Sequence, residues 1–227
     1  MQQIAEAGFD GVKTVIIITP DGPETQTLGV IADESEAQGV RSVTHAVTVM
    51  DTLAAVEADT HMLVHTPHIQ MLTEEQAQVV ADSGIPMVST LGIFVPYFDD
   101  ANDPIFRDAL PYPWENISSA GQGPVNARML WEAGVTYGFG TDVSYHPDIT
   151  LKQELKSLFL VFSEADILTI MTRHSAVAIG QEDNLGTLEA GKIADVVFVD
   201  GDPHQDIFDL MNVVLVIKEG RVVVDNR

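Results

Sequence analysis

Strand-like and helix-like segments alternate over the first 180 residues, and this alternation constrains the fold more than any other feature. Short runs rich in β-branched residues lie at 12–18, 40–45, 61–65, 85–90 and 135–142. Helix-forming segments lie at 25–38, 49–58, 74–83, 119–133, 150–161 and 164–179. Such alternation indicates a parallel sheet covered by helices. The continuous apolar run at 12–18 predicts a strand buried on both faces.

The pattern changes towards the C-terminus. The segments IADVVFVD, VVLVIKEG and RVVVDNR are strand-like, with no helix of comparable length between them. A complete (β/α) barrel of the TIM type needs roughly 250 residues, whereas the chain has 227. We therefore expect an α/β fold that is either one large domain or a partial TIM-type (β/α) barrel over residues 1–180 followed by a small β appendage over residues 181–227.

The charge is strongly one-sided: 34 acidic and 11 basic residues give a formal net charge of −23. Such a surface repels nucleic acid and anionic membranes, so neither is expected as a partner. The acidity fits either an ordinary acidic enzyme or adaptation to high salt. The absence of cysteine excludes disulfides and thiolate metal sites. No signal-like N-terminus or membrane-length apolar run is present, which predicts a cytoplasmic protein.

Four polar residues accompany the strand-like runs: Lys13, His45, His65 and Asp142. The C-terminal ends of the strands in a (β/α) barrel open onto one face, where active sites lie. Imidazole nitrogens and carboxylate oxygens are ligands of Zn²⁺ and related ions. A bound divalent ion makes water acidic enough to supply hydroxide near neutral pH. The pattern therefore predicts a metal site, and the loop residues His68, Tyr145 and His146 are expected to contact a substrate.

Two features leave alternatives open. A lysine within an apolar strand is costly unless its charge is removed or paired, so Lys13 either contributes to the metal site or extends its amine from the strand into solvent. Residues 92–117 form a long, aromatic-rich insert after the fourth strand. Inserts of this length are often lids or binding loops, so the segment is either a substrate-covering loop or a hydrophobic plug.

Several motifs carry a resemblance to a known family. TRHSAVAIG, LGTLEAGKIADVVFVDGDP and VVLVIKEGRVVVD resemble the C-terminal part of metal-dependent amidohydrolases of the imidazolonepropionase-like or Xaa-Pro dipeptidase-like branch. The segments THAVTVMDTLAAVEADTHMLVHTPHIQMLTEE and YGFGTDVSYHP resemble the fifth, sixth and eighth strand units of that family. The resemblance covers nearly the whole chain and implies that the β appendage belongs to a composite β-sandwich.

The resemblance also implies site roles. His45 and His65 would bind one divalent ion, most often zinc, and Asp142 would bind metal and act as general base and then general acid. Lys13 would be carboxylated and would bridge two ions. The substrate would be a small amide, a cyclic amide or a dipeptide, hydrolysed at a C–N bond.

One family feature is missing: no His-x-His pair occurs in the chain. We therefore expect that the first three strand–helix units are absent and that the chain is truncated. Three functions remain open: a metal-dependent hydrolase, a catalytically inert fragment, or a half-barrel completed by a partner chain. The segment at 12–18 would then be an open sheet edge, for which self-association into a homo-oligomer is expected.

Overall fold

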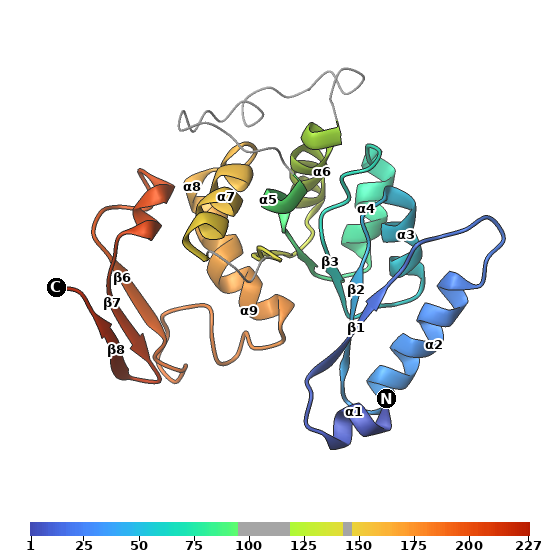
Figure 1. Cartoon of the computed structure of the whole chain (residues 1–227), viewed down its shortest axis with the longest axis horizontal. Coiled ribbons are helices and arrows are strands. Elements are labelled where there is room, and N and C mark those ends of the chain that lie inside the picture. Colours follow the sequence, from blue (N-terminus) through green and yellow to red (C-terminus); the bar gives the residue numbers. More distant parts are fainter. Residues whose placement is uncertain (95–118, 143–146) are drawn as a thin grey trace.

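The computed structural model describes residues 1–94, 119–142 and 147–227, and it contains two sheets. The first is a five-stranded parallel sheet in the order β1-β2-β3-β4-β5. Its strands are β1 (Gly11–Val15), β2 (Arg41–His45), β3 (Met62–Val64), β4 (Met87–Val88) and β5 (Tyr137–Gly138). Figure 1 shows it to the right of a second sheet. The parallel α/β fold class predicted from the sequence is confirmed.

The second sheet is antiparallel and three-stranded. It consists of β6 (Val196–Val199), β7 (Val213–Lys218) and β8 (Arg221–Asp225), in that order. It contains the strand-like segments expected near the C-terminus. The proposed domain boundary between residues 180 and 181 stays a prediction.

Helix α1 (Gln2–Glu6) precedes β1, and the other helices follow parallel strands in sequence. They are α2 (Glu24–Ala37), α3 (Val49–Glu57), α4 (Glu74–Asp82), α5 (Leu91–Phe94), α6 (Ser119–Ala133), α7 (Pro147–Phe159), α8 (Glu164–Thr169) and α9 (Ser175–Ala178). In Figure 1, α2, α3 and α4 lie to the right of the parallel strands, and α7, α8 and α9 lie between the two sheets. A π-helical segment spans Ile170–His174, and a 3₁₀ helix spans Ile207–Met211. Among the described segments, no helix has the length and apolarity needed to cross a membrane.

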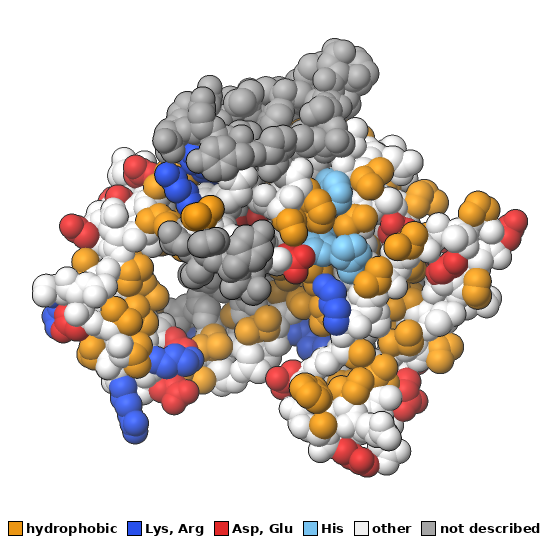
Figure 2. All heavy atoms as spheres, viewed as in Figure 1, with side chains coloured by type: hydrophobic (Ala, Val, Ile, Leu, Met, Phe, Trp, Pro, Cys, Tyr) orange, Lys and Arg blue, Asp and Glu red, His pale blue; other side chains and the backbone are white. Residues whose placement is uncertain are grey.

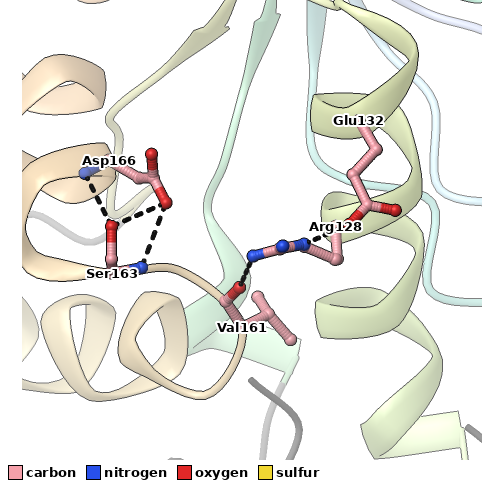
Figure 3. Close-up of polar contacts among 5 residues, drawn as sticks. All are labelled: Arg128, Glu132, Val161, Ser163 and Asp166. Atoms are coloured by element: carbon pink, nitrogen blue, oxygen red, sulfur yellow. Dashed lines mark hydrogen bonds and ion pairs between the residues drawn. The ribbon is translucent and has the colours of Figure 1, made fainter. Parts of the chain in front are cut away.

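Local capping explains where two of these helices begin. Thr73 and Gln76 form a capping box at the start of α4, as predicted. Ser163 and Asp166 form the equivalent arrangement at α8, and Figure 3 shows these contacts. The same view shows Arg128 of α6 donating to the carbonyl oxygen of Val161 at 2.9 Å, which ties α6 to the turn before α8.

The core lies between the parallel sheet and its helices. Leu63, Met87 and Tyr137 from three neighbouring strands are fully buried against Leu130 of α6 and Leu155 of α7. Each such apolar side chain contributes about 1.5–3 kcal/mol on burial. This core fixes the strands, and therefore fixes the positions of the residues that follow their C-terminal ends.

Strand β1 corrects one expectation. The run at 12–18 was expected to be buried on both faces, but the strand ends at Val15, and the side chains of Val15 and Ile17 are 60% and 66% exposed. The reason is its place in the sheet, because β1 is an edge strand that pairs only with β2 among the described residues. The expected open edge is confirmed, but burial of that edge is not.

The predicted helix at 164–179 is interrupted. It divides into α8, the π-helical segment and α9. At this interruption the hydroxyl of Ser175 donates to the carbonyl of Ile170 at 2.7 Å and accepts the N–H of Phe139 at 2.9 Å. The segment thereby holds the end of β5.

Most of the aromatic insert, residues 95–118, lies outside the described residues, so the lid and the plug both stay predictions.

Candidate functional site

Two histidines and one aspartate meet beyond the C-terminal ends of β2, β3 and β5. His45 is the last residue of β2 and lies opposite Val64, the last residue of β3, so His65 is the residue that follows β3. The two imidazole rings are 4.4 Å apart between centroids, edge to face. His65 Nε2 is 3.9 Å from Asp142 Oδ2. Figure 2 shows histidine side chains grouped beside charged side chains on one face of the molecule.

His65 is the most constrained residue of this group. Its side chain is 1% exposed, and its Nδ1 lies 2.6 Å from the hydroxyl of Thr90. Its Nε2 is buried and has no hydrogen-bond partner among the described residues. Buried polar atoms normally have a partner, so an unpartnered nitrogen that faces Asp142 fits a coordinating role. This atom supports a metal at the site.

The backbone at the site is also unusual. His65 has φ 80° and Asp142 has φ 51°, both in the left-handed region that residues with a side chain rarely adopt. Strained residues of this kind cluster at functional sites because the surrounding structure holds them in place. The two residues whose side chains approach each other are therefore both held in costly conformations.

Burial keeps the imidazoles neutral. It lowers the pKa of His65 to about 4, with a smaller contribution from neighbouring His45, while Asp142 acts in the opposite direction. Burial also lowers the pKa of His45 and of His68. A neutral imidazole has one free lone pair, which is on Nε2 when Nδ1–H donates to the hydroxyl of Thr90. In that tautomer His65 Nε2 is available as a ligand near neutral pH.

Lys13 lies in the middle of β1 and not at the level of the histidines. It is opposite Val43 in the register, whereas Val15 is opposite His45. Its side chain is largely exposed, yet partial burial of the amine by the sheet lowers its pKa, and Asp142 raises it by a smaller amount. Lys13 is therefore electrostatically coupled to Asp142.

The expected substrate residues are placed only in part. The ring of His68 stacks on Phe94 of α5, with centroids 3.8 Å apart and an interplanar angle of 15°. Phe94 also meets His65 edge to face at 5.3 Å. Tyr145 and His146 lie outside the described residues.

Among the residues that are described, no group of three or more His, Asp or Glu side chains has a metal-holding arrangement.

Thr90 was not identified as a site residue from the sequence. Its signal was present, because it ends the strand-like run IPMVST just as His45 and His65 end theirs. Glu154, which supports the same region from α7, gives no such signal, since it lies within an ordinary helical segment.

A parallel sheet with histidines and an aspartate at or after the ends of its strands places the chain among α/β proteins with a polar site at the C-terminal ends of their strands. The profile of the Amidohydrolase family matches residues 10–223, so the chain belongs to this family. The family expected from the motifs is therefore confirmed.

Similar proteins are known by sequence and by structure. Imidazolonepropionase of Thermoanaerobacter pseudethanolicus is 26% identical over 179 residues, which cover 75% of this chain and 36% of that enzyme. A crystal structure of an amidohydrolase matches 99% of this chain and 57% of its own, with a TM-score of 0.75 and 25% identity. A Xaa-Pro dipeptidase with bound methionine in the active site matches with a TM-score of 0.73 at 22% identity, which shows the fold alone. The chain thus spans about half the length of the amidohydrolase structure.

Proposed function

We propose that this protein is a metal-dependent hydrolase of C–N bonds in small amides, cyclic amides or dipeptides. The observation that carries the proposal is the buried Nε2 of His65, which has no hydrogen-bond partner among the described residues and faces Asp142. The neighbouring ring of His45 would supply a second imidazole ligand close to the first. Membership of the Amidohydrolase family and the similarity to an imidazolonepropionase support the same reaction class.

His45, His65 and Asp142 would hold the ion, because nitrogen and carboxylate ligands suit zinc. In the described residues these three side chains lie near one another but do not form a metal-holding group, so binding would require them to move closer together. A bound zinc ion would acidify water and polarise the substrate carbonyl. The protein would contribute the orientation of each ligand. Thr90 fixes the ring of His65 through Nδ1, which leaves Nε2 directed at the site.

Asp142 would perform the proton transfers. Its side chain is 50% exposed, so water and substrate can reach its carboxylate. It would accept the proton of the attacking water and then deliver it to the leaving nitrogen. His68, Tyr145 and His146 would contact the small-molecule substrate. The stacking of Phe94 on His68 orients that imidazole at the rim of the site.

Lys13 would belong to a two-ion version of the site. A lowered lysine pKa increases the neutral amine, which is the form that reacts with CO₂ to give a carbamate. A carbamate would supply oxygen ligands and would remove the positive charge beside the histidines. With a single ion, Lys13 would remain an ordinary amine near Asp142.

One observation favours a second candidate, in which the sheet is completed by a partner chain. The edge strand β1 leaves Val15 and Ile17 exposed, and neighbouring Phe9 is 64% exposed. An apolar edge with unpaired backbone groups pairs readily with another strand. Self-association through this edge would then assemble the active form, and a chain without such a partner would be inert.

Zinc content and hydrolysis test the proposal together. After dialysis, the parent is expected to retain zinc, whereas the double variant His45→Ala/His65→Ala retains little. At saturating zinc, Asp142→Asn is expected to lower amide or dipeptide hydrolysis about 10²–10⁴-fold, because an amide cannot accept the proton of water. Background zinc in the parent, with the double variant indistinguishable from it, would contradict metal binding. Unchanged hydrolysis in Asp142→Asn would remove this residue from the mechanism.

A further inference from the structure

A fully buried carboxylate lies behind the candidate site. Glu154 of α7 is 0% exposed and accepts three hydrogen bonds. Its Oε1 accepts from the hydroxyl of Ser89 at 2.5 Å and from the N–H of Leu91 at 3.0 Å, and its Oε2 accepts from the N–H of Gly92 at 2.6 Å. Ser89 lies in the link between β4 and α5, and Leu91 and Gly92 are the first residues of α5. One side chain therefore holds residues 89–92, which we call the Ser89–Gly92 turn.

This turn is connected to both principal residues of the site. Thr90, at its centre, binds Nδ1 of His65 at 2.6 Å. Ser89 Oγ accepts the N–H of Gly140 at 3.3 Å, and the N–H of Thr90 donates to the carbonyl of Gly140 at 3.1 Å. Gly140 precedes Asp142 by two residues. Hydrogen bonds therefore run from Glu154 through the turn to His65 on one side and towards Asp142 on the other.

The backbone segments joined by these hydrogen bonds are closely packed at Gly92 and Gly140. A Cβ added to Gly92 would lie 3.0 Å from Glu154 Oε2 and 3.1 Å from the backbone nitrogen of Glu154. A Cβ added to Gly140 would lie 2.5 Å from Val88 Cγ1. Both glycines let a backbone segment approach its neighbour more closely than a residue with a side chain allows. A shift of the Glu154 carboxylate would therefore displace the turn and the end of β5.

We propose that Glu154 is a positioning residue that sets the orientation of His65 and Asp142 through the Ser89–Gly92 turn. Its role in catalysis rests on the hydrolase function proposed above. Glu154 contacts neither His65 nor Asp142 directly and acts through Thr90 and Gly140. The need for a carboxylate follows from the donor geometry, because two oxygens are required to accept from three donors. Burial raises the pKa of Glu154 to about 7, so the carboxylate is ionised above that pH, where its hydrogen bonds are roughly twice as strong as neutral ones.

The variant Glu154→Gln tests this role with little change of volume. Its amide nitrogen would face an N–H or O–H donor of the turn and could not accept a hydrogen bond. Ser157→Ala is the matched control, since Ser157 is also 0% exposed on α7, and its hydroxyl donates to the carbonyl of Gln153 at 2.8 Å, away from the turn. Both variants disturb a buried polar group on the same helix, but only one touches the turn.

Two measurements separate positioning from general stability. In the metal-free protein, Glu154→Gln is expected to speed amide hydrogen exchange at Leu91, Gly92 and Gly140 about 10–100-fold, without a matching change in α2 and α3. Zinc affinity, measured by competition with a chelator, is expected to fall about 10–100-fold. Ser157→Ala is expected to leave both quantities at parent values.

Each outcome decides the proposal. A parent protein that binds no zinc would contradict the proposed hydrolase function. Amide hydrogen exchange at Gly140 in Glu154→Gln would still test the positioning role. Exchange that rises equally across α2, α3 and the turn would reduce Glu154 to a general stabilising residue and overturn the proposal. If Glu154→Gln does not fold, Ser89→Ala provides the second test. It removes the hydroxyl that joins Glu154 to Gly140, but it leaves the bonds from Leu91 and Gly92 to Glu154 and the backbone bond from Thr90 to Gly140. Parent-like zinc affinity and Gly140 exchange in Ser89→Ala would then overturn the positioning role.

Discussion

Acidification from pH 7 to pH 5 is expected to destabilise the metal-free protein through His65. Burial lowers the pKa of this histidine from 6.5 to about 4 in the folded state. The unfolded chain therefore binds the proton more readily than the folded one between these two values. The free energy of unfolding has its full value above the ordinary pKa of 6.5, and it falls as the pH drops towards 4.

The magnitude follows from the separation of the two pKa values. Each unit corresponds to about 1.4 kcal/mol, so the complete transition is worth at most about 3 kcal/mol, and about 2 kcal/mol of this is reached by pH 5. Asp142 beside the ring is 50% exposed, so solvent reaches the edge of the site and screens part of the effect. We therefore expect a loss of about 1–2 kcal/mol.

Urea unfolding at pH 7 and pH 5, with a chelator present, measures this loss. The comparison is between the parent and His65→Gln, because the pKa values of His45, His68 and His174 are also lowered and these residues titrate in both proteins. Glu154, whose pKa burial raises to about 7, contributes with the opposite sign in both. The parent should lose about 1–2 kcal/mol more than the variant. An equal pH dependence in the two proteins would refute the reasoning.

Three further predictions follow from the described contacts. Thr90→Val should lower the free energy of unfolding by about 1–3 kcal/mol, measured by urea, because it removes the bond to His65 Nδ1 and leaves that nitrogen buried without it; a parent-like value would remove Thr90 as its partner. Ile17→Lys should reduce self-association in light scattering, because charge on an open edge opposes strand pairing; oligomers of unchanged size would place the contact elsewhere. Lys13→Ala should leave hydrolysis nearly unchanged if one ion is bound and should abolish it if two are bound; full activity alongside two bound ions would exclude a bridging carbamate.

The alternation of strands and helices was predictable because each element carries its own local signal. The caps at Thr73 and Ser163 were predictable for the same reason, since each hydrogen-bonds within its own turn. The exposure of Val15 and Ile17 was not, because the edge position of β1 depends on the arrangement of the whole sheet. A β-branched run looks the same whether one or two neighbours flank it.

Some residues of the candidate site could likewise be predicted from the sequence, and others could not. His45, His65 and Asp142 were predicted because the histidines end strand-like runs and the aspartate follows one. The structure brings the three side chains near one another. The supporting role of Glu154 depends on bonds to a turn more than sixty residues earlier, and no local pattern encodes such a contact. The positive φ of His65 could not be predicted either, because glycine is the residue that usually indicates a positive φ in a sequence.

The π-helical segment at Ile170–His174 sets the angular phase of everything after it in that helical stretch. A π-helical turn holds one residue more than an α-helical turn, so this segment takes up an extra residue while α9 keeps the phase in which Ala178 faces the end of β5. At that contact a Cβ on Gly138 would lie 3.2 Å from the Cβ of Ala178, so a side chain larger than alanine would be crowded. Deleting one residue within the π-helical segment would convert it to an α-helical turn and keep Ala178 in place. The same deletion inside α9 would bring Ile179 to the place of Ala178, against the end of β5.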